Sequence, residues 1–594
     1  MEYKDGTITD YKAAAKDFIE NEKQFHLGGI PTEQSNPLTR GLSAKIARST
    51  KEGVKTILRA DKYIPNVAAE CFETEAFKAM VADIRRIIDE KRTVLFSSVG
   101  ASGRMGLQLE STWHLFWESL TQKIPARAEE FNRISRCCNS FMTGGDRATV
   151  RSVENFEDYQ TFGARQIVDS GVSKGDVVIV LAECGLSSST IGSAIEAADR
   201  GIATYYFHCN PREVLCRYLE RARKVFARTD ITFLPLYVGN MAVAGSTRMQ
   251  VTTVELLVAG AALELASWAW LKDNLSADEL KAVGAGVLEP NEYAAHFQSL
   301  VCQLSCGEAL EGMAQMVDYE KATYEKGGLI TYCAHEYLQD ILTDTTERQP
   351  TFTLPPFRKS NDTTSPLSWA YAKDPLYPSK IAWQHIIRRP IKGLDWTVQD
   401  YIDMKADQGI IDNPPSVGSE ELDYYMIGNE DDKTRYSQHP AHLVCVDINN
   451  SATDGSYAWF KDNLEHFDGG VVVRMGDISG TYENEIRVPV SLPHTIMELL
   501  PHLMVKLAFN MMSTATMAKM GRVWSNWMIQ VLPTNKKLID RSTRVIAELA
   551  HISYQEACEE FFKSYLNRPK DQEYRESYVV ETLKRLGVDQ NKED

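Results

Sequence analysis

Two segments rich in serine and glycine are the clearest candidates for chemistry in this chain. Residues 99–103 follow an apolar, β-branched run at 94–98, and residues 183–190 follow a similar run at 176–182. A strand, a loop of small residues and a helix start bring backbone N–H groups and the positive end of a helix dipole to one point, where a phosphate can bind. The first loop lacks the lysine of a nucleotide P-loop and the third glycine of a dinucleotide fingerprint. We therefore expect a phosphate pocket lined by hydroxyl groups.

The pattern around these loops predicts the sheet that must position them. Strand patterns at 94–98, 176–182 and 202–207 alternate with helical patterns, which is typical of a doubly wound parallel sheet. Ligands bind at the carboxyl ends of the strands in such sheets. The two loops should therefore converge on one anion, although either loop alone could be a plain strand-to-helix turn.

Four separated motifs make the chain recognisable. Residues 100–106 (Gly-Ala-Ser-Gly-Arg-Met-Gly), 144–148, 153–158 and 244–249 resemble, in order and spacing, the sugar isomerase (SIS) domain family. They are most similar to the branch that holds the N-acetylmuramic acid 6-phosphate etherases and glucokinase regulatory protein. The C-terminal segments 507–517, 521–528 and 534–538 resemble the same branch.

The length of the chain helps to distinguish a resemblance to the etherases from one to glucokinase regulatory protein. An etherase of this family has one SIS domain and pairs with a second copy of itself. Here the interval between 249 and 507 is long enough for another domain. Within it, 341–352 resembles the family segment that follows the first phosphate loop, and 442–447 and 470–474 read as strands. No Gly-x-Ser-Gly precedes residue 341, so the resemblance implies a degenerate second SIS domain and an internal pseudo-dimer.

These observations predict an α/β fold with four parts. They are an N-terminal helical arm (1–44), a first SIS domain that binds sugar phosphate, with connecting helices (45–330), a second SIS domain with degenerate phosphate loops (331–499) and an all-helical C-terminal lid (500–594). Each SIS domain is expected to be a flavodoxin-like, three-layer αβα unit with a doubly wound parallel sheet.

The resemblance also implies which residues bind the ligand. Ser102, Ser187 and Ser246 match the serines that contact phosphate in the family, although each could instead be a helix N-cap. Hydroxyl and N–H groups bind phosphate without a fixed cation. The predicted ligand-binding set is Gly100, Ser102, Gly103, Arg104, Glu154, Gly185, Ser187, Ser246, Glu347, Asn535, Lys537 and Arg541.

Two basic residues of the predicted lid share one helix face. Lys537 and Arg541 are spaced i and i+4 and match lid residues of glucokinase regulatory protein that reach the ligand. If Asn535 caps this helix, two lysines lie in its first turn, where positive charge opposes the dipole. Such a misfit is typical of a working site, but a plain charged surface is the alternative.

Whether the protein is an enzyme depends on a pair of carboxylates. Releasing lactate from the sugar requires a base and an acid. Glu154 matches a glutamate that contacts the sugar and acts as acid or base in the etherases; it could instead complement a helix dipole. The position of the family's second glutamate holds Thr112, and Glu110 lies about 200° further around the helix. Glu347 of the second domain matches that glutamate, so Glu154 and Glu347 could face one sugar.

Two functions therefore remain open. The first, which we favour, is a non-catalytic sensor similar to glucokinase regulatory protein, which binds a fructose or amino-sugar phosphate and modulates a partner such as a sugar kinase. The second is an N-acetylmuramic acid 6-phosphate etherase, a carbon–oxygen lyase that releases D-lactate with Glu154 and Glu347 as catalytic residues. An aldose–ketose isomerase fits the resemblance less well.

Composition narrows the partners and the compartment. The net charge of −16 disfavours nucleic acid as a partner, and eleven scattered cysteines favour a reducing compartment. The start of the chain does not resemble a signal peptide. The apolar stretch 254–271 carries Glu255 and Glu264 and reads as a core helix, not a membrane span. We expect a cytoplasmic protein without a membrane partner.

No cofactor or metal is predicted. His439 and His442 have a loose metal-like spacing, but the proline between them would break the helix that such a pair needs. Because the two SIS domains would pair within one chain, we expect a monomer or a weak homo-oligomer.

Overall fold

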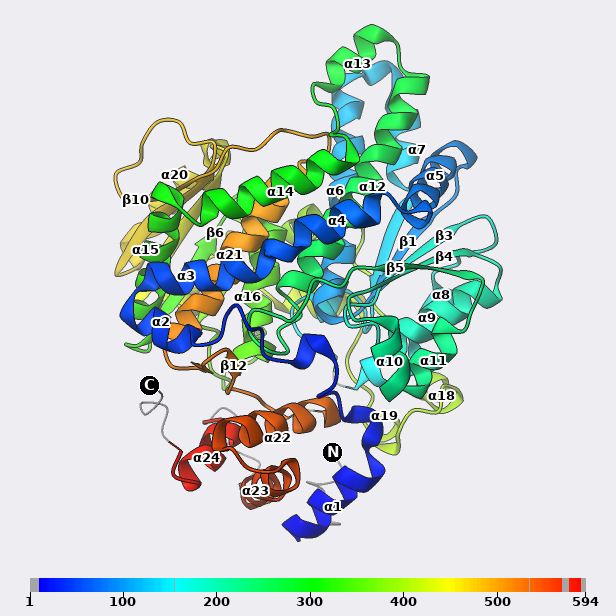
Figure 1. Cartoon of the computed structure of the whole chain (residues 1–594). Coiled ribbons are helices and arrows are strands. Elements are labelled where there is room, and N and C mark those ends of the chain that lie inside the picture. Colours follow the sequence, from blue (N-terminus) through cyan, green and yellow to red (C-terminus); the bar gives the residue numbers. More distant parts are fainter. Residues whose placement is uncertain (1–9, 154, 534, 569–575, 589–594) are drawn as a thin grey trace.

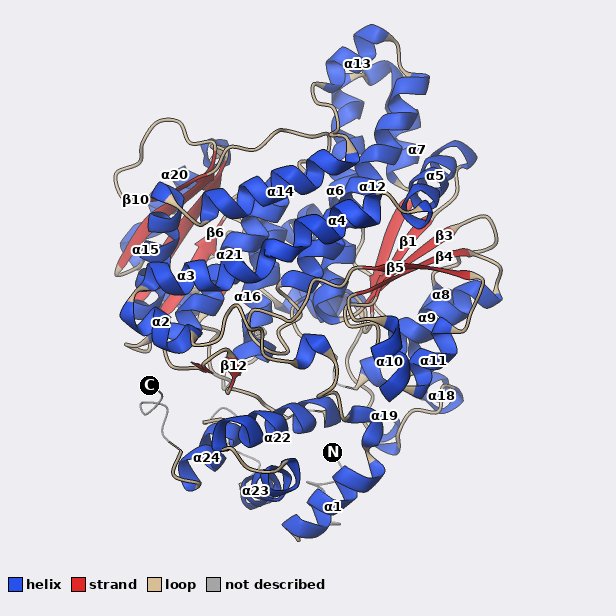
Figure 2. Ribbon diagram, in the orientation of Figure 1, coloured by secondary structure: helices blue, strands red, loops and turns tan. Residues whose placement is uncertain are grey.

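The computed structural model (Figure 1) describes residues 10–153, 155–533, 535–568 and 576–588. It contains two five-stranded sheets, and every strand pairing within them is parallel. Helices flank both sheets, and helices dominate the C-terminal region (Figure 2). The predicted fold class, two tandem doubly wound α/β units with a helical C-terminal region, is confirmed.

The first sheet has the strand order β2-β1-β3-β4-β5. All residues of β1 and β3 are buried, as expected for strands covered by helices on both faces. The winding direction reverses between β1 and β3, so a crevice opens beyond their carboxyl ends. The strands are β1 (Val94–Ser98), β2 (Cys138–Met142), β3 (Val177–Leu181), β4 (Ala203–His208) and β5 (Ile231–Pro235).

The second sheet repeats this arrangement. Its order is β10-β9-β8-β6-β7, so the first strand in the sequence again lies between the second and the third. The segments 442–447 and 470–474 lie in β8 and β9, as predicted. The strands are β6 (Leu329–Cys333), β7 (Ala370–Lys373), β8 (Ala441–Ile448), β9 (Gly469–Gly476) and β10 (Glu485–Pro489).

Four long helices join the two sheet units. The helices α6 (Gly100–Lys123) and α12 (Gln250–Asn274) follow strands of the first sheet, and they contact α16 (Leu338–Phe352) and α21 (Leu499–Lys519), respectively. The helix α12 is long and apolar enough to cross a membrane, but 83% of its most apolar window is buried inside the protein. It is therefore a core helix, as predicted from its two glutamates.

Helices from the N-terminal and C-terminal parts of the chain lie together on one side of the molecule (Figure 1). The N-terminal helix α1 (Tyr11–Asn21) packs against α23 (Tyr554–Asn567). The helix α22 (Lys536–Ala550) contacts α23 and α24 (Tyr578–Arg585). The side chain of Asn535 accepts the N–H of Leu538 at 3.0 Å and caps α22. Asn535 is thus the predicted cap, and two lysines begin the helix.

The remaining helices cover the sheets or connect them. In the first half they are α2 (Leu42–Arg48), α3 (Thr50–Leu58), α4 (Ile64–Phe72), α5 (Glu75–Glu90), α7 (Ala128–Ser135), α8 (Gln160–Asp169), α9 (Ser188–Asp199), α10 (Arg212–Tyr218) and α11 (Glu220–Phe226). The later ones are α13 (Ala277–Val283), α14 (Pro290–Leu304), α15 (Gly307–Tyr324), α17 (Ser379–Ile387), α18 (Val398–Asp403), α19 (Gln408–Asp412) and α20 (Ser456–Asn463). A short hairpin of β11 (Val523–Trp524) and β12 (Trp527–Met528) precedes α22.

Candidate functional site

A cavity of about 230 Å³ lies beyond the carboxyl ends of β1 and β3. Its wall is built by the start of α6, the loops after β2 and β3, the loop before α12, the helix α16 of the second sheet unit and the start of α22. Seven predicted ligand-binding residues line it, namely Gly100, Arg104, Ser246, Glu347, Asn535, Lys537 and Arg541. The structure therefore brings together residues that lie more than 400 positions apart in the sequence.

The other predicted residues take different places. Gly103 lies in α6 against Met142. Gly185 and Ser187, in the second loop, are not among the residues that line the cavity; Gly185 packs against His208, and Ser187 is the N-cap residue of α9. Glu154 lies outside the described residues.

The hydroxyl of Ser102 does not face the cavity. It donates a hydrogen bond to Glu255 of α12, and burial raises the pKa of Glu255 to about 8 against the opposing effect of this bond. Only the backbone N–H of Ser102 is directed toward the site, where it donates to the Glu183 carboxylate at 3.3 Å. Side-chain contact between Ser102 and phosphate, as the sequence motif suggests, would require its bond to Glu255 to break.

Ser246, in the loop before α12, lines the cavity. Its side chain is buried, with only 4% of the residue exposed, and its Oγ has no hydrogen-bond partner among the described residues. Buried hydroxyl groups in proteins are almost always hydrogen-bonded. A phosphate oxygen bound beside Ser246 could accept the hydrogen bond that this hydroxyl does not donate within the protein.

Glu183, which the sequence analysis did not single out, occupies the expected anion position. Its carboxylate accepts hydrogen bonds from the Ser102 N–H, in the first turn of α6, and from the Thr247 hydroxyl, both at 3.3 Å. Its backbone has a φ of +44°, a strained conformation for a residue with a side chain. Burial raises the pKa of Glu183 to about 7; Lys537 opposes this shift, and the nearby Glu347 carboxylate adds to it.

Two buried ion pairs join the first sheet unit to α16. Arg104 of α6 donates to Glu347 at 3.0 Å, and neither side chain is more than 5% exposed. Arg248, from the loop before α12, donates to Asp344 at 2.8 Å. Burial favours the neutral form of Asp344, but the charges of Arg348 and Arg248 outweigh it and leave its pKa below the usual range. Glu347 thus lies over the first loop, where the resemblance predicted it. Glu110 points away and accepts from Arg389 at 2.8 Å.

The cations of α22 are also paired. Lys537 donates to Glu157 at 3.0 Å; burial opposes its charge, but the carboxylate raises its pKa. Arg541 donates to both oxygens of Glu33 at 2.9 and 2.6 Å. Burial favours the neutral form of Glu33, but the neighbouring Arg541 and Arg544 lower the pKa of Glu33 to about 2. A ligand must therefore compete with a carboxylate for each of four cations on the cavity wall, namely Arg104, Arg248, Lys537 and Arg541.

The loop that carries Glu157 is held by residues of the second sheet unit. Phe156 stacks on Trp396 with ring centroids 5.9 Å apart and an interplanar angle of 11°. Tyr401 of α18 lies edge-on against Phe156 and Phe162. An excursion between α17 and α19 thus reaches across the first unit and fixes one wall of the cavity.

Comparisons with known proteins agree with the predicted resemblance. Residues 77–199 match the family model of the glucokinase regulatory protein N-terminal SIS domain. The chain is 27% identical over 241 residues to N-acetylmuramic acid 6-phosphate etherase of Salmonella typhi, an alignment that covers 39% of this chain and 69% of that protein. It is 24% identical over 234 residues to N-acetylmuramic acid 6-phosphate etherase 2 of Enterococcus faecalis, with the same coverage.

A putative tagatose-6-phosphate ketose/aldose isomerase of Clostridium novyi gives a TM-score of 0.41 at 10% identity, covering 81% of this chain and 92% of that one. The predicted resemblance to the SIS domain family, with likeness to both the glucokinase regulatory protein and the etherases, is confirmed.

Proposed function

We propose that the protein binds a sugar phosphate in the 230 Å³ cavity and acts as a regulator whose state depends on that ligand. The unpaired, buried hydroxyl of Ser246 is the observation that carries the binding proposal. Other groups suited to a phosphate dianion are the backbone N–H groups at the start of α6, the Thr247 hydroxyl and the ammonium group of Lys537 in α22.

A regulatory role is favoured because separate parts of the chain build the cavity wall. The two sheet units and α22 each contribute charged residues, and ion pairs join them across the cavity. A phosphate that takes Lys537 from Glu157 and displaces Glu183 changes how α22 is held. A ligand that binds one arrangement better than another shifts the population toward it, and so alters the affinity for a partner that contacts α22. A sugar kinase is the partner that we propose on the resemblance.

Catalysis is less favoured by the placement of Glu347. A general acid must deliver a proton to the leaving oxygen, whereas Oε1 of Glu347 already accepts an N–H of Arg104. One observation nevertheless supports the etherase alternative. Glu183 lines the cavity, and its pKa of about 7 suits an acid or base at neutral pH.

The remaining expectations follow from the same proposal. We propose four domains: the arm at 1–44, the SIS units at 45–330 and 331–499, and the lid at 500–594. The helix α21, which belongs to the last segment, packs between the sheet units. We propose that the protein is cytoplasmic, because its scattered cysteines favour a reducing compartment. We also propose a monomer or weak homo-oligomer, because the two proposed SIS units would pair within one chain.

The proposal is tested by incubating the purified chain with N-acetylmuramic acid 6-phosphate and assaying D-lactate, with Glu183→Gln and Glu347→Gln beside the wild type. A regulator releases no lactate, yet its thermal unfolding midpoint rises with a sugar phosphate. Lactate release that either variant abolishes establishes the etherase alternative. Both functions are overturned if the chain releases no lactate and also shows no thermal shift with fructose 6-phosphate, glucosamine 6-phosphate or N-acetylmuramic acid 6-phosphate.

A further inference from the structure

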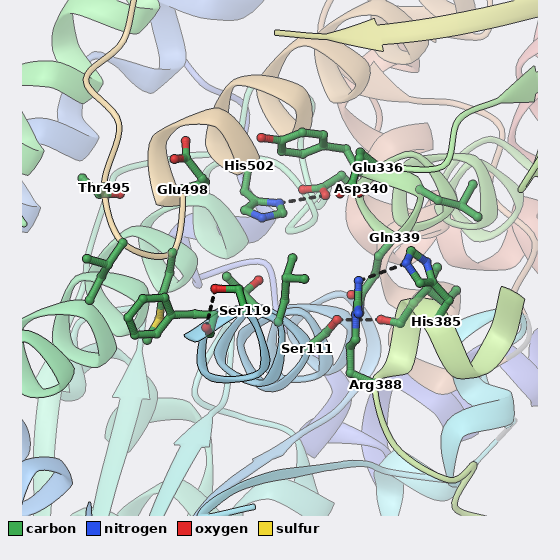
Figure 3. Close-up of a pocket in the computed structure, with 18 of the residues that line it drawn as sticks. Ser111, Ser119, Glu336, Gln339, Asp340, His385, Arg388, Thr495, Glu498 and His502 are labelled. Carbon is green, nitrogen blue, oxygen red and sulfur yellow. Dashed lines mark hydrogen bonds and ion pairs between the residues drawn. The ribbon is translucent and has the colours of Figure 1, made fainter. Parts of the chain in front are cut away.

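A second, larger cavity of about 290 Å³ lies at the matching position of the second sheet unit (Figure 3). The first cavity adjoins the start of α6 after β1; the second adjoins the start of α16 after β6, the corresponding strand. Its wall includes Thr112 of α6 and His502 of α21. The second unit therefore has a cavity at the position that corresponds to the first, although the segment after β6 lacks the serines and glycines of the first loop.

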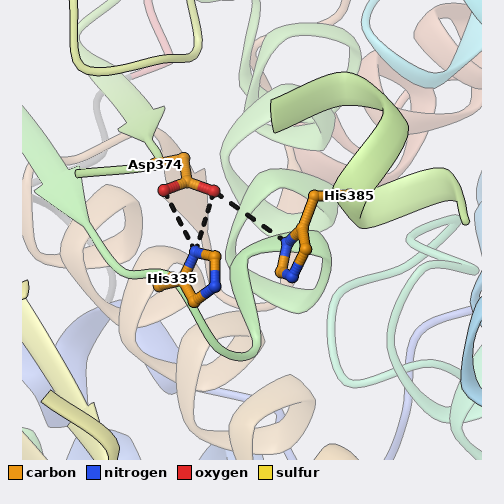
Figure 4. Close-up of side chains that lie close together, drawn as sticks. All are labelled: His335, Asp374 and His385. Atoms are coloured by element: carbon orange, nitrogen blue, oxygen red, sulfur yellow. Dashed lines mark hydrogen bonds and ion pairs between the residues drawn. The ribbon is translucent and has the colours of Figure 1, made fainter. Parts of the chain in front are cut away.

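Three potential metal ligands converge on one wall of this cavity (Figure 4). His335 follows β6, Asp374 follows β7, and His385 lies in α17. His335 Nδ1 is 3.0 Å from Asp374 Oδ2, and His385 Nδ1 is 4.0 Å from the same oxygen. One ligand atom from each residue lies within 4.8 Å of the other two. The two imidazole rings are nearly parallel, with centroids 4.2 Å apart.

We propose that His335, Asp374 and His385 bind a late first-row divalent cation such as Zn²⁺, with a fourth coordination position open to the cavity. Two imidazoles and one carboxylate are a ligand set of the kind that binds Zn²⁺, and sites with three protein ligands leave room for water or another ligand. Both histidines line the cavity, whereas Asp374 is fully buried behind them. The metal would therefore lie between the aspartate and the open space.

The surroundings of the cluster suit a cation. Oδ1 of Asp374 accepts the backbone N–H groups of Leu376 and Tyr377 at 2.8 and 3.2 Å. These bonds orient the carboxylate, as outer hydrogen bonds do in metal sites. Both of its oxygens lie within 3.1 Å of His335 Nδ1, and Oδ2 is also the oxygen nearer to His385. His385 Nδ1 is buried and has no hydrogen-bond partner in the described part of the chain. Glu336 lines the same cavity and adds negative charge.

Arg388 is the group that must move. Its Nη2 lies 3.0 Å from Nε2 of His385 (Figure 3). Coordination through Nδ1 puts the ring proton on Nε2, where it opposes an arginine N–H. Arg388 Nη1 already lies 3.6 Å from Glu118 Oε2, which is partly exposed. The guanidinium therefore has an alternative partner, and metal binding is expected to shift it toward Glu118.

The test uses the full chain, stripped of metal with a chelator and titrated calorimetrically with Zn²⁺ at pH 7.5. We expect one equivalent to bind, with at least tenfold weaker binding in His335→Gln and in His385→Gln. His439→Gln is the matched control, because His439 forms an exposed pair with one carboxylate, Asp468, at 2.7 Å; it should bind as the wild type does.

Two results would overturn the proposal: no Zn²⁺ bound by the wild type, or Zn²⁺ binding in both histidine variants that is as tight as in the wild type. Circular dichroism and the unfolding midpoint establish whether the variants are folded. Co²⁺ titration of the wild type gives a readout that needs no variant. Coordination by two imidazoles and a carboxylate produces d–d absorption bands in the visible region above those of aqueous Co²⁺, and a spectrum equal to that of aqueous Co²⁺ contradicts the site.

Discussion

Replacing Glu183 with glutamine should strengthen sugar phosphate binding and remove part of its pH dependence. In the structure the Glu183 carboxylate accepts hydrogen bonds from the amide N–H of Ser102 and the hydroxyl of Thr247. A phosphate would use the same two donors. The ionised carboxylate competes with a phosphate for this position, whereas its neutral form does not repel one. Glutamine keeps the shape of the side chain and removes the charge.

The size of the effect follows from the pKa of about 7. If only the neutral form admits phosphate, half of the molecules are competent at pH 7 and about one in eleven at pH 8. The ratio of variant to wild-type affinity should then be near 1 at pH 6, about 2 at pH 7 and about 10 at pH 8, equivalent to ~1.4 kcal/mol. Comparing the two proteins at each pH cancels the titration of the phosphate itself.

The assay is isothermal titration calorimetry at pH 6, 7 and 8 with the sugar phosphate that shifts the unfolding midpoint most. Glu213→Gln, an exposed residue in the first turn of α10, is the control for removing one negative charge from the same domain. The reasoning is refuted if the affinity ratio of Glu183→Gln to wild type stays constant from pH 6 to 8, or if Glu213→Gln gives the same ratios.

Three further predictions concern the other groups of the site. Ser246→Ala should weaken sugar phosphate binding about tenfold, because hydrogen bonds to charged groups contribute ~1.5–3 kcal/mol, and should leave the free energy of unfolding nearly unchanged, because its Oγ has no protein partner in the described residues. Arg104→Met should lower the free energy of unfolding by about 3–5 kcal/mol, since it leaves Glu347 buried without its partner. The variant Arg104→Met/Glu347→Leu should recover most of that loss. Glu33, whose pKa is about 2 in the folded chain, should contribute about 3 kcal/mol of stability above pH 4.5. That contribution is lost as the pH falls from 4.5 to 2, because the unfolded chain takes up the proton first.

Urea unfolding measures the stability predictions, and calorimetry measures the binding of Ser246→Ala. Unchanged binding in Ser246→Ala would remove Ser246 from the ligand site. A double variant as unstable as Arg104→Met alone would show that the lost bonds of Arg104, which also donates to the carbonyl oxygens of Thr149 and Gly100, determine the loss, and not the stranded carboxylate. The Glu33 prediction fails if Glu33→Gln and the wild type differ equally in stability at pH 3 and pH 6.

The sequence predicted the architecture well because the signals were local or repeated. Apolar runs ending in small residues marked β1 and β3, and the two glutamates within an apolar stretch marked α12 as a core helix. The cap at Asn535 was visible from residue types alone. Glu347 could be placed over the first loop only through the family resemblance, because 243 positions separate it from Arg104.

Other features depend on packing that the sequence does not reveal. Glu183 lies in a loop that was interpreted from its serines and glycines. Its backbone adopts a positive φ, and its carboxylate accepts the amide N–H of Ser102 in α6. Ser102 is turned to Glu255 because α12 passes behind α6. The ligand atoms of His335, Asp374 and His385 converge only because β6 and β7 are neighbours in the second sheet, so no spacing motif records them.

Calorimetric titration of the full chain at pH 7 with fructose 6-phosphate, glucosamine 6-phosphate and N-acetylmuramic acid 6-phosphate tests the central claim most directly. We predict that at least one of them binds at one site per chain, and that Ser246→Ala weakens this binding whereas Glu213→Gln does not. Absence of binding for all three sugar phosphates, or binding that Ser246→Ala leaves unchanged, would contradict it.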